Sequence, residues 1–69
     1  MKLRINGEER SFDSKAVADV ESLLKTLGVS ATRGVAVAVN DEVVRRNDWA
    51  NATLAEGDRV EVIRATQGG

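Results

Sequence analysis

The sequence contains no cysteine and no histidine. Without cysteine, a disulfide framework, a thiol nucleophile and a thiolate metal site are excluded. Without histidine, the commonest metal ligand and the usual general base of enzyme catalysis are missing as well. We therefore expect no metal site and no catalytic centre, and an enzyme that acts by itself is not favoured.

Aromatic side chains, net charge and long apolar runs are equally scarce. Phe12 and Trp49 are the aromatic residues, and eleven acidic against ten basic residues leave a net charge of -1. Neither a basic surface nor a stacking platform for nucleic acid follows from this composition. The first residues lack an apolar run of signal-peptide length, and no segment has the apolar length of a membrane helix. We expect a cytoplasmic protein that binds neither nucleic acid nor membrane.

The length of 69 residues sets a further limit. A chain of this size forms one small domain that buries only about 60% of the surface exposed by its unfolded state. Its folding free energy is roughly 3–10 kcal/mol, and so small a core can hardly surround a deep substrate pocket. We assign residues 1–65 to this domain and residues 66–69 to a flexible C-terminal tail that ends in Gly-Gly.

A hairpin is predicted at the beginning of the chain. Residues 2–6 alternate apolar and polar side chains, and residues 8–12 can return as a second strand. Between them, Asn6-Gly7 is the strongest short signal for a two-residue hairpin turn.

A helix is predicted next. Asp13 or Ser14 can cap its N-terminus, and the apolar side chains that follow recur at helical spacing. These side chains are Val17, Val20, Leu23, Leu24 and Leu27. Gly28 is expected to end the helix in a left-handed conformation, with Val29 folding back in a Schellman motif.

The second half of the chain is strand-like. In residues 34–40, valines alternate with Ala36 and Ala38, so the valines are expected to lie under the helix and the alanines on the opposite face. Asn40-Asp41 is a tight turn into another strand. In residues 59–65, Val60 and Val62 take the core face and Glu61 and Ile63 the other.

The order strand, strand, helix, strand, strand, strand predicts an α+β fold. Periodicity alone does not choose among the small α+β folds that this order allows. If the first and last strands lie side by side at the sheet centre, their connection passes through the helix and is long enough for parallel pairing. This arrangement is a β-grasp, a small mixed sheet of four to five strands with one main helix packed on one face.

Several motifs along the chain resemble one family. "VAVAVNDEVVRR", the single Trp, "LAEGDRVEVIRA" and the final "QGG" look like the ThiS family, the sulfur carrier proteins of thiamin biosynthesis, over residues 3–69. The resemblance implies a ubiquitin-like β-grasp. Arg45 and Thr66 depart from the family pattern, in which proline and an apolar residue are common at these positions.

The resemblance also implies a function at the C-terminus. Gly69 would be adenylated by a ThiF-type adenylyltransferase that uses ATP, and its carboxylate converted to a thiocarboxylate that donates sulfur to thiazole synthase. The sulfur would come from a donor such as a cysteine desulfurase system. The chain would bind no cofactor and would be a protein co-substrate, monomeric when free, and not an enzyme.

Two features of the surface would serve this role. The tail Thr66, Gln67, Gly68 and Gly69 spans about 13–14 Å when extended, and the absence of side chains at its end leaves the carbonyl open to attack. Ala36, Ala38 and Ile63 are expected to form an apolar contact for the activating enzyme on the sheet face away from the helix, bounded by charges such as Arg4, Arg59 and Glu61.

Two other functions share these features. The small subunit of molybdopterin synthase has the same fold and terminal Gly-Gly, and a ubiquitin-like protein modifier uses the same activation step before it is joined to lysines. Growth requirements of a deletion strain would separate the first from the thiamin carrier, and higher-mass conjugates in cells would indicate the second.

Overall fold

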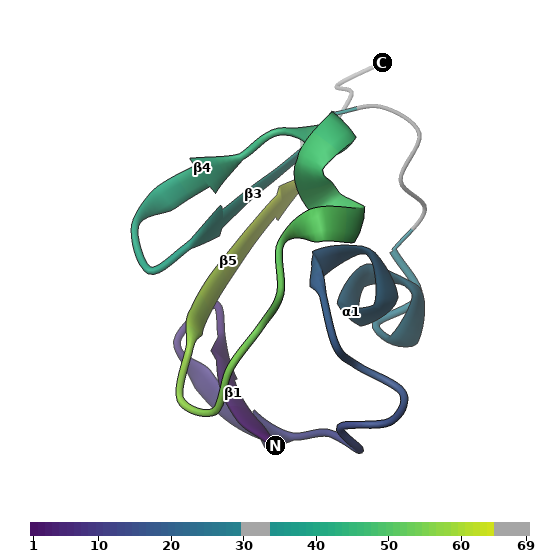
Figure 1. Cartoon of the computed structure of the whole chain (residues 1–69). Helices are drawn as coiled ribbons and strands as arrows, with labels where there is room; N and C mark the ends of the chain where they lie inside the picture. Colours follow the sequence, from purple (N-terminus) through teal and green to yellow (C-terminus); the bar gives the residue numbers. More distant parts are fainter. Residues whose placement is uncertain (30–33, 65–69) are drawn as a thin grey trace.

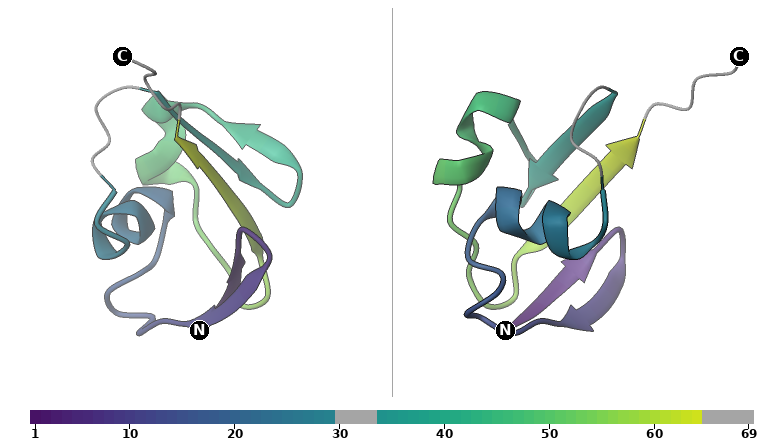
Figure 2. Two further views of the ribbon diagram at one scale, coloured as in Figure 1. Left: turned by 180° about the vertical axis from the view of Figure 1, so that it is seen from behind. Right: turned by 90° about the vertical axis from the view of Figure 1, so that its right-hand side faces the viewer.

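The computed structural model describes residues 1–29 and 34–64. Its elements follow the predicted order, with one additional short helix (Figure 1). They are β1 (Lys2–Ile5), β2 (Glu8–Ser11), α1 (Val20–Thr26), β3 (Val35–Val39), β4 (Glu42–Val44), the 3₁₀ helix η1 (Arg46–Asn51) and β5 (Arg59–Arg64). The strands form one sheet in the order β2-β1-β5-β3-β4. Both helices lie on the same side of this sheet, so its other face is open (Figure 2).

Strand pairing places the last strand at the centre of the sheet. β1 and β5 run parallel, with Arg4 opposite Arg59 and Ile5 opposite Val60. The pairs β1 with β2, β3 with β4 and β3 with β5 are antiparallel. The predicted parallel pairing and the predicted mixed sheet with a helix on one face are therefore confirmed.

Both hairpins turn where the sequence predicts. Asn6 and Gly7 have φ angles of 50° and 87°, and Asn40 and Asp41 have φ angles of 51° and 71°. Positive φ at both central residues is the geometry of the two-residue turn that suits the twist of antiparallel strands. Asparagine and aspartate tolerate this conformation better than other residues with side chains.

The same two asparagines tie their turns to β5. The Asn6 carboxamide accepts a hydrogen bond from the backbone N of Val62 at 2.8 Å and donates one to its carbonyl at 3.2 Å. The Asn40 carboxamide accepts from the backbone N of Arg59 at 2.9 Å and donates to the Asp58 carboxylate at 3.0 Å. The first turn therefore holds the central strand at Val62, and the second holds it at its first residue, Arg59.

The helix begins later than the sequence predicts. Its N-cap is Asp19, which forms a capping box with Ser22, and not Asp13 or Ser14. The residues before it pair with a distant segment: Asp19 forms a β-bridge with Thr53, and the backbone N of Leu54 donates to the carbonyl of Ala18 at 2.9 Å. This tertiary pairing keeps Asp19 extended, so the turn that Asp13 forms with the backbone N of Lys15, Ala16 and Val17 does not continue into α1.

The end of the helix agrees with the prediction. Gly28 has a φ angle of 76°. The backbone N of Gly28 donates to the Lys25 carbonyl at 3.1 Å, and that of Val29 donates to the Leu24 carbonyl at 2.9 Å. These two bonds are the pair that defines a Schellman motif.

The core lies between the sheet and the two helices. Val37 and Val60 are buried on the helix side of β3 and β5, as predicted. Trp49 of η1 exposes only 4% of its surface, and its indole N donates to the Val44 carbonyl at 3.0 Å. The other buried apolar side chains are Leu3, Ile5, Val17, Val20, Leu23, Leu24 and Leu54. Within the described ranges, no helix has the length and apolar character needed to cross a membrane.

Candidate docking face and carrier terminus

The open face of the sheet carries an apolar patch. Ala36 pairs with Ile63 across β3 and β5, and Ala38 pairs with Val43 across β3 and β4. Directly paired residues point to the same face, so these four side chains are neighbours on the side away from α1. Ile63 exposes 62% and Val43 77% of their surface, which makes them the exposed large apolar residues of the described chain. We call Ala36, Ala38, Val43 and Ile63 the open-face patch.

The structure brings together the three predicted docking residues and adds a fourth. Ala36, Ala38 and Ile63 share one face, as the alternation in their strands indicates. Val43 was not among the predicted residues. Its signal lies in the two-residue turn at Asn40-Asp41, which sets Ala38 opposite Val43.

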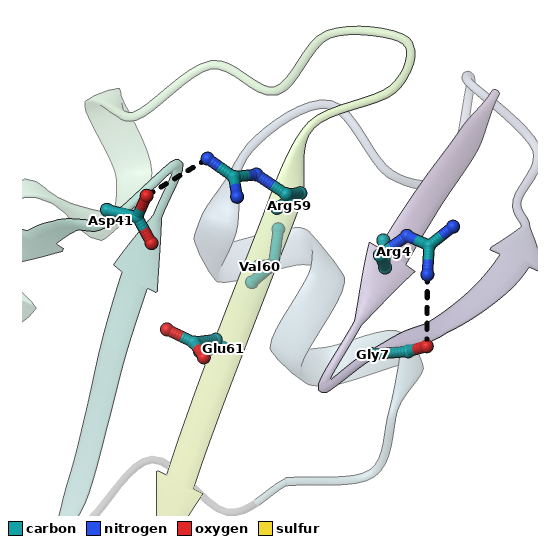
Figure 3. Close-up of a pocket in the computed structure, with 6 residues that line it drawn as sticks. All are labelled: Arg4, Gly7, Asp41, Arg59, Val60 and Glu61. Carbon is teal, nitrogen blue, oxygen red and sulfur yellow. Dashed lines mark hydrogen bonds and ion pairs between the residues drawn. The ribbon is translucent and has the colours of Figure 1, made fainter.

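Charged side chains occupy the adjoining part of the open face. They surround a shallow pocket of about 130 Å³ (Figure 3), lined by Arg4, Gly7, Asp41, Arg59, Val60 and Glu61. Arg59 forms an ion pair with Asp41 at 3.0 Å. Arg4 donates from its guanidinium to the Gly7 carbonyl at 3.3 Å. Of the predicted boundary charges, Glu61 adjoins Ala38 and Ile63 directly, and Arg59 and Arg4 lie beyond it on β5 and β1.

The pocket has no groups arranged for catalysis or for a metal. In the part of the chain that the structure describes, no three Asp or Glu side chains gather as metal ligands. The pocket is small and open, and its arginines are engaged with Asp41 and Gly7. What the open face offers chemically is therefore a contact surface, apolar at one end and ionic at the other.

The predicted reactive tail follows directly after this surface. Ile63 of the open-face patch is the residue before Arg64, at which β5 ends. Thr66, Gln67, Gly68 and Gly69 lie outside the described residues. Their role and the boundary between domain and tail at residue 65 stay predictions.

A mixed sheet with β5 at its centre and α1 across one face defines a ubiquitin-like β-grasp protein. A model of the ThiS family matches residues 3–69. The chain belongs to the ThiS family, and the family predicted from its motifs is confirmed.

Individual relatives agree with this assignment. The chain is 37% identical over 65 residues to the sulfur carrier protein ThiS of Thermus thermophilus, covering 94% of this chain and 95% of that protein. It is also similar to a crystal structure of a thiamine biosynthesis protein (ThiS) from Geobacter metallireducens, with a TM-score of 0.83, 33% identity and full coverage of both chains.

A third relative is much longer than this chain. Over 69 residues the chain is 44% identical to a thiazole synthase of Paramagnetospirillum magneticum, covering all of this chain but 20% of that protein. The chain thus spans about a fifth of the length of that relative. The similarity concerns this segment of the thiazole synthase.

Proposed function

We propose that the chain is a sulfur carrier for thiamin biosynthesis, a protein co-substrate and not an enzyme. The observation that carries this proposal is the match to the ThiS family, which extends through Gly68 and Gly69. The name of the Thermus thermophilus relative, sulfur carrier protein ThiS, supports the same role. The thiazole synthase that shares a segment with this chain supports thiazole synthase as the recipient of the sulfur.

The chemistry takes place at the carboxylate of Gly69. One carboxylate oxygen attacks the α-phosphorus of ATP, pyrophosphate leaves, and an acyl adenylate forms. A sulfur nucleophile then attacks the carbonyl carbon and displaces AMP. When this nucleophile is a persulfide of the sulfur donor, the product is an acyl disulfide. A thiol then cleaves its S–S bond and is itself oxidised to a disulfide, which leaves the terminus as a thiocarboxylate that can transfer its sulfur to the thiazole precursor. ATP is a substrate of a ThiF-type adenylyltransferase in this scheme, and the carrier itself needs no bound cofactor.

The open-face patch is the proposed docking site of the adenylyltransferase. Exposed apolar side chains that lie together are a common feature of protein interfaces. Ile63 is six residues before Gly69, so an extended tail reaches at most about 20–22 Å from the patch. When an enzyme holds the patch, the terminal carboxylate can therefore reach an active site that lies within this distance of Ile63.

Intact-mass spectrometry tests this function directly. The chain is incubated with ATP, its cognate adenylyltransferase, a cysteine desulfurase with cysteine as the sulfur source, and a thiol reductant. We expect its mass to rise by the difference between sulfur and oxygen, and to remain unchanged when ATP is omitted. A variant that lacks Gly69 is the matched control and should gain no sulfur. No mass change in the complete reaction would contradict the proposal, and conjugates to lysines would indicate a protein modifier instead.

A further inference from the structure

Glu61 lies where the open-face patch meets the charged pocket, with Arg59 two residues before it along β5. It is opposite Ala38 in β3, whose other neighbour across the sheet is Val43. Along β5 it is two residues before Ile63, and side chains two apart in a strand share a face. The Glu61 carboxylate therefore has members of the open-face patch on two sides.

No side chain of the described residues neutralises this carboxylate. The ion pairs in residues 1–29 and 34–64 join Lys2 to Glu9, Lys25 to Glu21 and Arg59 to Asp41. Figure 3 shows the side chain of Arg59 turned toward Asp41 and that of Arg4 turned toward Gly7. The two arginines that share the pocket with Glu61 are thus engaged elsewhere, and Glu61 depends on water for its solvation.

A partner that covers the patch must also cover Glu61. Removing an ionised carboxylate from water without a compensating partner costs several kcal/mol, which is comparable to the gain from burying a complete isoleucine side chain, about 1.5–3 kcal/mol. If the partner's surface were purely apolar, the free energy lost by desolvating Glu61 would cancel the free energy gained by burying Ile63. A basic side chain at this position removes the loss.

We infer that the adenylyltransferase presents a lysine or arginine to Glu61, at the border of the apolar surface on which it docks. This inference rests on the proposed function and names the chemistry of the partner. Glu61 then determines specificity, because it rejects surfaces that are apolar or acidic at the matching point. Arg4, on the β1 side of β5 and away from the patch, is not required for this contact.

The substitution Glu61→Gln tests the inference, because the inference predicts weaker binding of the adenylyltransferase and not tighter binding. It keeps the size of the side chain and removes the charge. Binding of the adenylyltransferase, measured by isothermal titration calorimetry, should weaken by about tenfold or more if a buried cation loses its partner. The salt dependence of the dissociation constant should also become less steep. Glu42→Gln is the matched control. Glu42 is opposite Val39, which takes the helix side of β3, so Glu42 lies on the face away from the open-face patch. The Glu42→Gln variant should therefore bind the adenylyltransferase as tightly as the unchanged chain does.

Other results would overturn the inference. Tighter binding by Glu61→Gln would mean that the carboxylate is covered without a cation, and unchanged binding would place Glu61 outside the interface. If Glu61→Gln weakens binding to thiazole synthase and leaves binding to the adenylyltransferase unchanged, the basic side chain belongs to thiazole synthase. The intact-mass assay on the unchanged chain separates failure of this inference from failure of the proposed function. If the proposed function is wrong, the unchanged chain gains no sulfur. If only the inference fails, that chain still gains sulfur at its normal rate.

Discussion

Replacing Ile63 by glutamate should weaken binding of the adenylyltransferase by about 2–5 kcal/mol. Ile63 exposes 62% of its surface. Since complete burial of isoleucine is worth about 1.5–3 kcal/mol, covering the exposed part contributes about 0.9–1.9 kcal/mol. Introducing a carboxylate that keeps part of its hydration costs a further 1–3 kcal/mol or so, less than the several kcal/mol of complete desolvation. With a factor of ten for each 1.4 kcal/mol, the dissociation constant should rise about 30-fold or more.

The substitution should leave the domain folded. Loss of the β-branched side chain from β5 costs up to about 1 kcal/mol, which is small beside roughly 3–10 kcal/mol for the whole chain. Thermal unfolding followed by circular dichroism checks this, and calorimetric titration gives the affinity. Ser14→Glu is the control, because it adds the same charge at an exposed position before α1. If Ile63→Glu is folded and binds within twofold of the unchanged chain, the open-face patch is not part of the interface.

Three other substitutions test the terminus and the fold. One alanine added after Gly69 should abolish ATP–pyrophosphate exchange without affecting thermal unfolding, because it displaces the carboxylate by about 3.3–3.6 Å; exchange at a normal rate would exclude Gly69 as the activated residue. Asn6→Ala should lower the free energy of unfolding in urea by about 1–3 kcal/mol through lost bonds to Val62 and a strained turn; Asn6→Gly keeps the turn, so an equal loss would contradict the strain. Trp49→Phe should cost about 1–3 kcal/mol because the Val44 carbonyl loses its donor, and an unchanged urea midpoint by circular dichroism would contradict this bond.

The parts of the fold decided by local chemistry could be predicted from the sequence. Asn6-Gly7 and Asn40-Asp41 determine their turns because few other residues adopt positive φ twice in succession. Gly28 ends the helix for the same reason. The start of α1 was predicted wrongly, since it depends on pairing between Asp19 and a segment more than thirty residues later. Alternation of apolar residues alone does not reveal that contact.

The candidate site was predictable to a similar extent. The shared face of Ala36, Ala38 and Ile63 follows from the period of a strand. Val43 required the register between β3 and β4, and the isolation of Glu61 required knowledge that Arg59 takes Asp41 as its partner. Such choices among neighbouring charges depend on side-chain positions in three dimensions. The function came from the family motifs, because 69 residues with this composition carry no catalytic pattern of their own.

The central place of β5 has a consequence for folding kinetics. In the sheet, the hairpin of β1 and β2 and the hairpin of β3 and β4 are joined through β5, the last strand along the chain. The bonds from Asn6 to Val62 close a loop of 56 residues, and contacts so distant in sequence form slowly because of their entropic cost. Until β5 inserts, Ala36 and Ile63 are not neighbours and the open-face patch is incomplete. An enzyme that recognises the open-face patch therefore selects chains that have completed folding, and leaves nascent or cleaved ones unactivated.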